Sequence, residues 1–276
     1  MEKYYQQFFM DQSKVEYWDS IYDQQDFSSY CYRQRMGIAI SWLEALNLGR
    51  DAKILDAGCG AGRLSNYVLR EGYNIFGMDY SLGMLAKANR ICNTDNKLAV
   101  AFLQGDVETL PLKDSSVDVL ICLGVITYLK SEDSALRELE RVLKPGGVLI
   151  ISILNKARLV KRLDIPLLFS AILKKIISIF SAFSKNDIGI HTAPKITTYS
   201  IPKIQKSLEL TGFNVLEYKT APMELPTLFG KEIYPRKIAE NIALFCEQFS
   251  GIPFVGSFGG MCIFKAEKNS VEWISE

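Results

Sequence analysis

The stretch that decides the fold is Leu55-Asp56-Ala57-Gly58-Cys59-Gly60-Ala61-Gly62. The apolar run 52–58 that leads into it is predicted to be a buried strand, and 61–71 is predicted to be a helix. Glycines at such a turn adopt backbone angles closed to other residues and let the backbone approach a ligand closely. The free N–H groups at the N-terminus of the predicted helix would face the same ligand. The stretch therefore predicts a ligand-binding loop.

The alternation of strand and helix continues outward from this loop. Near-continuous apolar strands separated by helices indicate a parallel sheet covered on both faces. Right-handed crossovers then give a doubly wound α/β fold. Strands are expected at 52–58, 73–79, 98–106, 116–124, 148–154, 213–220 and 259–268, and helices at 34–47, 61–71, 81–92, 131–143, 200–211 and 233–249.

Composition narrows the class of protein. The chain has 276 residues and a formal net charge of +1, so its overall charge does not favour nucleic acid as a partner. Its six cysteines include no CxxC pair, which disfavours a disulfide framework and fits a reducing cytoplasm. The only histidine is His191, so we expect no metal site. The N-terminus lacks the pattern of a signal peptide.

The spacing of the glycines selects among nucleotide ligands. The dinucleotide fingerprint needs a glycine three places after its second glycine, and that place is held here by Arg63. The carboxylate of Asp56 would repel a pyrophosphate, whereas it suits a cationic group. Both observations argue against a nicotinamide-dependent oxidoreductase.

Acidic residues close the next two strands. Asp79 ends the second strand, where a carboxylate accepts hydrogen bonds from the two hydroxyls of a ribose. Asp106 ends the third strand and is placed to bond an exocyclic amine while Val107 packs on a base. These positions fit a ligand with a cationic amino acid end, a ribose and an adenine, and without phosphate.

The run from Lys53 to Ser152 resembles the class I S-adenosylmethionine-dependent methyltransferase family. Four blocks carry the resemblance in order: ILDAGCGAG, the acid in GMDYS, GDVETLPLKDSSVDVL and RVLKPGGVLIIS. It implies a seven-stranded, mostly parallel sheet with an antiparallel last strand, and S-adenosyl-L-methionine as cofactor. It also implies that Asp56 and Gly58 line the amino acid end, Asp79 the ribose and Asp106 the adenine amine. The expected cofactor-binding residues in the domain are Asp56, Gly58, Cys59, Gly60, Asp79, Tyr80, Asp106, Val107 and Leu123.

The remaining segments are interpreted around this domain. Residues 1–33 are rich in aromatic side chains and, by the resemblance, form a lid in which Tyr17 and Trp18 contact the cofactor. Packing in the core is the alternative for this leader. The expected divisions are the lid 1–33, a cofactor-binding half 34–155, an insertion 156–199, and 200–276 with a helical insertion at 221–257.

The insertion 156–199 hints at the acceptor. Both insertions should leave the sheet at the carboxyl ends of its strands, where open α/β sheets bind ligands. The apolar run 165–183 carries Lys174 and Lys175 in its middle and is too short and too charged to span a membrane comfortably. A basic amphipathic segment over 156–185 suits peripheral membrane contact or closure over an apolar ligand. A solvated basic face packed on the domain is the alternative.

The predicted activity is methyl transfer to a small-molecule or lipid-like acceptor with an apolar part, to oxygen or carbon rather than nitrogen. His191 and Tyr128 are the candidate catalytic residues, since an oxygen or carbon acceptor can need a base. A loop histidine that tethers the next segment is the alternative for His191. Arg33 and Arg35 are candidates to hold an acidic group of the acceptor. A non-catalytic cofactor-binding module is the competing function, and the oligomeric state is left open.

Overall fold

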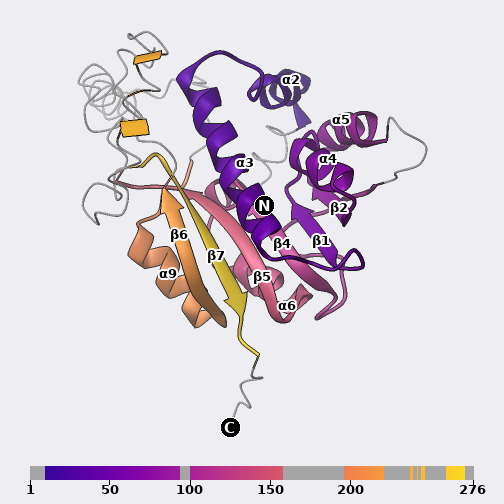
Figure 1. Ribbon diagram of the computed structural model, residues 1–276, viewed down its shortest axis with the longest axis vertical. Coiled ribbons are helices and arrows are strands. Elements are labelled where there is room, and N and C mark those ends of the chain that lie inside the picture. The colour runs from indigo at the N-terminus through magenta and orange to yellow at the C-terminus, as the bar shows by residue number, and fades with distance from the viewer. Residues whose placement is uncertain are drawn as a thin grey trace, which may run out of the picture.

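The computed structural model describes residues 10–93, 100–157, 196–220 and 259–270, together with 237, 238, 241, 244 and 245. These residues contain one seven-stranded sheet in the order β3-β2-β1-β4-β5-β7-β6 (Figure 1). The strands are β1 (Lys53–Ala57), β2 (Asn74–Asp79), β3 (Ala101–Gln104), β4 (Val117–Leu123), β5 (Leu143–Leu154), β6 (Phe213–Thr220) and β7 (Met261–Lys268).

Strand directions follow the prediction. The pairs β2–β3, β1–β2, β1–β4 and β4–β5 are parallel, whereas β7 runs antiparallel to both of its neighbours, β5 and β6. The predicted mostly parallel sheet with an antiparallel last strand is therefore confirmed.

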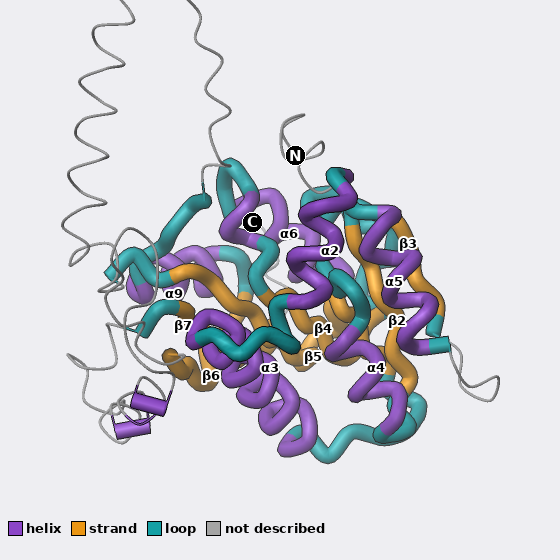
Figure 2. Tube along the Cα trace, turned by 90° about the horizontal axis from the view of Figure 1, so that it is seen from above, coloured by secondary structure: helices purple, strands orange, loops and turns teal. Residues whose placement is uncertain are grey.

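Helices cover both faces of the sheet. They are α2 (Gln12–Ser20), α3 (Phe27–Ala45), α4 (Arg63–Arg70), α5 (Leu82–Cys92), α6 (Asp133–Val142) and α9 (Ile201–Leu210), with a short 3₁₀ turn η1 (Ile126–Tyr128). One apolar core joins the sheet to α3, α4 and α5, and a second joins its other face to α6 and α9. Figure 2 shows α3 and α4 on one side of the strands and α6 on the other.

Two element boundaries differ most from the expectation, and the others lie within a few residues of it. Helix α3 begins at Phe27 instead of 34, because the Asp26 carboxylate caps its first turn by accepting the Ser29 N–H at 2.7 Å. Strand β5 begins at Leu143 instead of 148. Leu143 pairs with Val117, and a register shift then absorbs the following residues before regular pairing resumes at Val148.

The carboxyl edge of the sheet is where the two predicted insertions leave and rejoin it. Lys156, just after β5, donates its N–H to Tyr199 O at 2.8 Å, and Tyr199 N–H returns to Leu154 O at 2.9 Å. The second segment leaves after Thr220 and rejoins at Gly260, whose carbonyl accepts the Asn155 N–H at 3.1 Å. Residues 158–195 and most of 221–258 lie outside the described residues. The expected helix over 233–249, the membrane contact over 156–185 and the division into segments therefore stay predictions.

Within the described ranges, none of the helices has the length and apolar character that crossing a membrane requires.

Candidate functional site

A cavity of about 180 Å³ opens at the carboxyl edge of the sheet. Successive parallel strands contribute to it where they end, as expected for ligand sites in open α/β sheets. Its walls include Asp56 from β1 and Gly58 directly after it, Asp79 from β2, Val107 after β3, Leu123 from β4 and Leu154 from β5.

The glycine loop forms the floor of this cavity. Gly58 has φ +79° and Gly60 has φ +53°, both in the left-handed region that favours glycine. The N–H groups of Gly58 and Cys59 donate to Met78 O at 2.7 and 3.0 Å, which ties the loop to the end of β2. A Cβ on Gly58 would lie 2.1 Å from Val125 Cγ2, whereas a Cβ on Gly60 would have no protein atom within 4 Å. Gly58 is thus enclosed by protein, and Gly60 faces open space.

Alanine substitutions should separate these two roles. We expect Gly58→Ala to destabilise the fold by about 2–3 kcal/mol, because the methyl group overlaps Val125 in a strained backbone. Gly60→Ala should cost only about 1–2 kcal/mol of strain but should weaken adenosyl ligands about tenfold or more, because its methyl group occupies the cavity. Thermal unfolding and calorimetric titration measure the two effects. Equal loss of ligand affinity without a stability difference would contradict this assignment.

Asp79 connects the glycine loop to the turn after β2. Its Oδ2 accepts the Gly60 N–H at 2.9 Å, and its Oδ1 accepts the Ser81 N–H at 2.9 Å. Burial raises the pKa of this carboxyl, while the backbone N–H groups oppose that rise. Because a carboxylate has about four lone-pair positions, Asp79 keeps acceptor capacity for a ligand.

Asp56 is a nearly buried acid, with 3% of its surface exposed. The Ser65 hydroxyl donates to its Oδ2 at 2.7 Å. Burial raises the pKa of Asp56 to about 7; the Ser65 hydrogen bond and the charge of Arg35 lower it, while the charge of Asp79 raises it. An acid in this state favours a cationic ligand group, which would stabilise its ionised form.

Buried polar atoms without partners gather around the cavity. Among the described residues, six side-chain N or O atoms are buried and make no hydrogen bond, and four of these belong to cavity-lining residues. The four atoms are Trp18 Nε1, Arg35 Nε, Arg63 Nε and Ser152 Oγ. Since buried polar groups are almost always paired, this clustering indicates a polar ligand.

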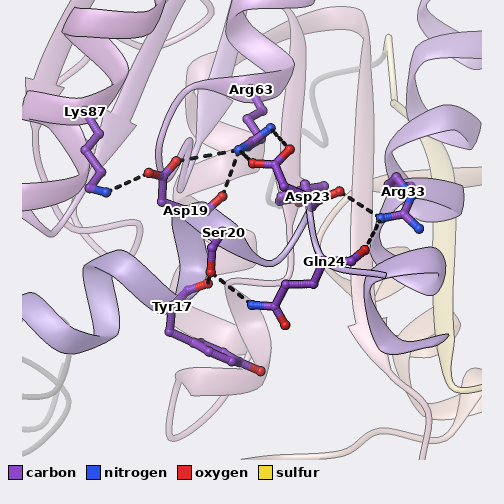
Figure 3. Close-up of polar contacts among 9 residues, drawn as sticks. Tyr17, Asp19, Ser20, Asp23, Gln24, Arg33, Arg63 and Lys87 are labelled. Atoms are coloured by element: carbon purple, nitrogen blue, oxygen red, sulfur yellow. Dashed lines mark hydrogen bonds and ion pairs between the residues drawn. The ribbon is translucent and has the colours of Figure 1, made fainter. Parts of the chain in front are cut away.

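Helix α2 carries Trp18 in the cavity wall. This helix and the turn after it are attached to α4 and α5 by ion pairs (Figure 3). Asp19 Oδ2 lies 2.6 Å from Lys87 Nζ, and Arg63 contacts Asp23 and donates to Asp19 O at 3.0 Å. Trp18 lines the cavity, whereas the Tyr17 side chain points away from these ion pairs in Figure 3.

Removing one of these ion pairs should loosen α2 more than it destabilises the fold. The Asp19 and Lys87 side chains are about a quarter exposed, so Asp19→Asn should change the free energy of unfolding by at most about 1 kcal/mol. We expect S-adenosylhomocysteine to dissociate several-fold faster, measured by stopped-flow Trp fluorescence. Glu16→Gln on the same helix removes the same charge and is the control. Equal dissociation rates in the two variants would contradict a role for Asp19 in holding the helix.

The structure brings most of the predicted cofactor residues together. Two of them, Tyr17 and Asp106, are not among the described residues that line the cavity. The Asp106 carboxylate accepts the Glu108 N–H at 3.0 Å within a turn, so its adenine role stays a prediction. The predicted residues that do line the cavity are Trp18, Asp56, Gly58, Cys59, Gly60, Asp79, Tyr80, Val107 and Leu123.

The two candidate catalytic residues differ in what can be said of them. Tyr128 lines the cavity at the end of η1, and burial raises the pKa of its hydroxyl. The raised pKa keeps the hydroxyl protonated, which suits a hydrogen-bond donor better than a base. His191 lies outside the described residues.

Several cavity residues were missed by sequence reasoning. Arg63 was interpreted only as the residue that breaks a glycine spacing, although it lines the cavity. Tyr22 and Tyr32 belong to the aromatic leader, but no spacing singled them out. Ser152 lies inside an apolar strand and gave no signal. The described residues also contain no group of acidic, cysteine or histidine side chains suited to a metal ion.

Comparisons with known proteins concern the domain that carries this cavity. Residues 55–151 match the family model of a methyltransferase domain. The malonyl-[acyl-carrier protein] O-methyltransferase of Pectobacterium atrosepticum is 39% identical over 102 residues, which cover 37% of this chain and 38% of that protein. The ubiquinone biosynthesis O-methyltransferase of Rickettsia bellii is 32% identical over 108 residues, covering 39% of this chain and 44% of that protein. These matches thus span less than half the length of either relative.

A solved structure extends the fold comparison over nearly the whole chain. The magnesium protoporphyrin IX methyltransferase of Synechocystis, with bound SAH, superposes with a TM-score of 0.63 at 19% identity. The match covers 98% of this chain and 100% of that one. The sheet, the cavity and the matched domain define a class I methyltransferase fold. Residues 55–151 thus match a methyltransferase domain, and the chain has the fold of solved S-adenosylmethionine-dependent methyltransferases.

Proposed function

We propose that the protein is an enzyme that transfers the methyl group of S-adenosyl-L-methionine to a small-molecule or lipid-like acceptor. The observation that carries this proposal is the cavity itself. It brings together two acids, the buried Asp56 and the partly buried Asp79, with a glycine, Gly60, at which an added Cβ would meet no protein atom within 4 Å.

The cavity residues fit the cofactor. Asp56 suits the ammonium group of its amino acid end, and Asp79 retains acceptor capacity for the ribose hydroxyls. Val107 and Leu123 add apolar surface for the base. When bound, S-adenosylmethionine supplies a methyl group on a positively charged sulfur, which an acceptor atom takes by in-line displacement.

The protein's own contribution is alignment and exclusion of water. Trp18 and Tyr128 meet edge to face, with ring centroids 6.1 Å apart, at the wall of the cavity. Aromatic rings near a sulfonium also add cation–π attraction. Because Tyr128 stays protonated, we expect it to orient the acceptor as a hydrogen-bond donor.

Oxygen is the acceptor atom that we favour. The two curated relatives are both named O-methyltransferases, one acting in ubiquinone biosynthesis and one on malonyl-[acyl-carrier protein]. An acceptor with an apolar part also agrees with the composition of the segment 165–183, whose flanks, Lys156 and Tyr199, lie at the carboxyl edge of the sheet.

Two measurements test the proposal. Calorimetric titration with S-adenosylhomocysteine and with NAD should show binding of the first only. Radiolabelled S-adenosylmethionine should then transfer its methyl group to at least one member of a panel of apolar phenols, quinols and carboxylic acids. Binding without transfer to any acceptor in the panel would favour a non-catalytic cofactor-binding module, and binding of NAD alone would favour an oxidoreductase.

A further inference from the structure

The loop that follows β3 is held from outside the cavity by two side chains of α6. Arg141 donates from its Nη1 to Leu112 O at 2.8 Å and from its Nη2 to Leu110 O at 3.0 Å. Glu138 Oε2 accepts the Leu110 N–H at 2.6 Å. The two side chains therefore bind the loop backbone on both sides of Pro111.

The two α6 side chains are also fixed to each other. Arg141 Nε donates to Glu138 Oε1 at 2.9 Å, and its Nη2 donates to Oε2 at 2.8 Å. This paired contact lowers the pKa of Glu138. Paired hydrogen bonds between a guanidinium and a carboxylate are strong and fix the orientation of both groups. Arg141 also contacts the Asp114 carboxylate at 2.5 Å, but the Asp114 side chain is 75% exposed, so this contact should add little.

The loop that Glu138 and Arg141 hold forms part of the cavity wall. Gly105 and Val107 line the cavity, and Val107 is buried. A Cβ on Gly105 would lie 3.4 Å from Pro111 Cδ, so the proline between the two bound carbonyls lies against the glycine at the cavity. A displacement of the backbone at Pro111 would therefore move the wall at Gly105 and Val107.

The rest of the loop is attached at its two ends. A local turn fixes its start, where the Thr109 N–H donates to Asp106 O at 3.0 Å. The end of α6 fixes its last residues, where the Ser115 N–H donates to Arg141 O at 2.9 Å. The Glu138 and Arg141 side chains bind the stretch between these ends. Removing either side chain should therefore release the middle of the loop while both ends stay attached, and the effect should be local.

We propose that Glu138 and Arg141 are positioning residues for the base-binding side of the cavity, which hold the loop so that Gly105 and Val107 contact the adenine of the methyl donor. This inference rests on the proposed function, which supplies the adenine. Both side chains act through the loop backbone, and neither is among the described residues that line the cavity. The expected consequence of their removal is a loss of selectivity for the base, because the contacts to the rest of the ligand come from other strand ends.

The first arm of the test compares two ligands that differ in the base. Calorimetric titrations use S-adenosylhomocysteine and S-ribosylhomocysteine, which lacks the adenine. The wild type should prefer S-adenosylhomocysteine by about a hundredfold. Arg141→Met and Glu138→Ala should each reduce this preference about tenfold and leave the affinity for S-ribosylhomocysteine within about twofold. Arg141→Lys, which keeps the charge on α6 but lacks the planar fork, should fold and lose part of the preference.

Glu140→Ala is the matched control for these variants. Glu140 lies on the same helix, and its ion pair with Lys268, at 3.0 Å, joins α6 to β7 and not to the loop. This variant should lower the unfolding temperature slightly and leave the preference for adenine unchanged. A purely structural role of α6 would instead make Glu140→Ala and Glu138→Ala alike.

The second arm uses the wild type alone, so that it does not depend on how the variants fold. Amide hydrogen exchange is measured with each ligand at saturation. S-adenosylhomocysteine should slow exchange at Val107 and Leu110 at least about fivefold more than S-ribosylhomocysteine does. The Lys53 amide, which donates to Asp118 at the other end of the strands, should exchange equally with both ligands.

The outcomes separate this inference from the proposed function. Equal exchange of the loop amides with the two ligands would overturn the inference, and so would an adenine preference that Arg141→Lys, Arg141→Met and Glu138→Ala all leave unchanged. In either case binding of S-adenosylhomocysteine by the wild type would leave the proposed function standing. Failure of the wild type to bind S-adenosylhomocysteine would reject the proposed function and the inference together.

Discussion

Asp79→Asn should weaken S-adenosylhomocysteine binding about a hundredfold while the sheet remains folded. In the native protein each carboxylate oxygen accepts one backbone N–H, from Gly60 and from Ser81. An amide presents one oxygen and one NH₂ group, so one of the two N–H groups would face another donor. The variant therefore loses a ribose acceptor and also the connection that shapes the glycine loop. Loss of a charged hydrogen bond with an unpaired donor left behind costs roughly 3 kcal/mol, which corresponds to that factor.

A matched control, Asp118, lies near the amino-terminal end of β4, at the other end of the strands from the cavity. Asp118 in β4 also accepts a backbone N–H, from Lys53 at 2.9 Å, and contacts Lys144 Nζ at 2.6 Å. Asp118→Asn should lower the unfolding temperature but leave the ligand affinity within about twofold, because these contacts lie away from the cavity. Calorimetric titration and thermal unfolding of both variants distinguish the outcomes. If both variants lost affinity equally, the effect would be general destabilisation and not a property of the site.

The parts of the site that could be predicted from the sequence lie at strand ends. Asp56 and Asp79 follow apolar runs that are long enough to be buried strands, and parallel strands present their carboxyl ends at one edge. Local sequence therefore carries both the element and the position of the side chain. The same reasoning placed Val107, and the resemblance to the methyltransferase family placed Leu123; both line the cavity.

The parts that could not be predicted depend on contacts between distant segments. Arg35 was one of two candidate arginines, and nothing local distinguishes it from Arg33. Only the packing of α3 against the sheet distinguishes them. It places the Arg35 guanidinium at the cavity, whereas the Arg33 guanidinium binds the backbone of the preceding turn. Asp106 was singled out by local sequence, yet it is not among the described residues that line the cavity. An acid after a strand also suits a tight turn, and the Asp106 carboxylate accepts the Glu108 N–H.

The start of β5 illustrates a further limit. The glycines after Leu143 look like a stop signal, so the strand was expected only from 148. Leu143 nevertheless pairs with Val117, and the intervening residues are accommodated as an irregularity in the ladder. A turn signal within a strand cannot be distinguished from a strand boundary until the partner strand is known.

Binding of the methyl donor or its product should release a proton from Asp56. In the free protein, burial raises the pKa of this carboxyl to about 7, against the opposing effect of the Ser65 hydroxyl. An ammonium group at the carboxyl would favour the ionised form and lower its pKa. Well below pH 7 the free protein carries the proton and the complex does not, so affinity should rise about tenfold per pH unit there and level off above pH 7.

Asp56 should also make the free energy of unfolding of the free protein depend on pH, and this dependence has the opposite sign to that of the ligand affinity. Between about pH 4 and pH 7 the unfolded chain has lost this proton while the folded protein retains it. The contribution of Asp56 to the free energy of unfolding therefore falls as the pH rises through this window and is constant above it. Asp56→Asn should remove this slope, which is measured by denaturant titration at pH 5, about 6 and about 8 against the wild type.

Calorimetry can count the proton directly. Titration of S-adenosylhomocysteine at about pH 6 in two buffers of different ionisation enthalpy should show release of nearly one proton, falling toward zero near pH 8. Asp56→Asn should bind more weakly and release none. Ser65→Ala is the informative second variant, because loss of the hydroxyl that lowers the pKa of Asp56 should move the release to higher pH. Wild-type binding without proton release at about pH 6 would contradict the contact proposed between the ammonium group of the ligand and Asp56.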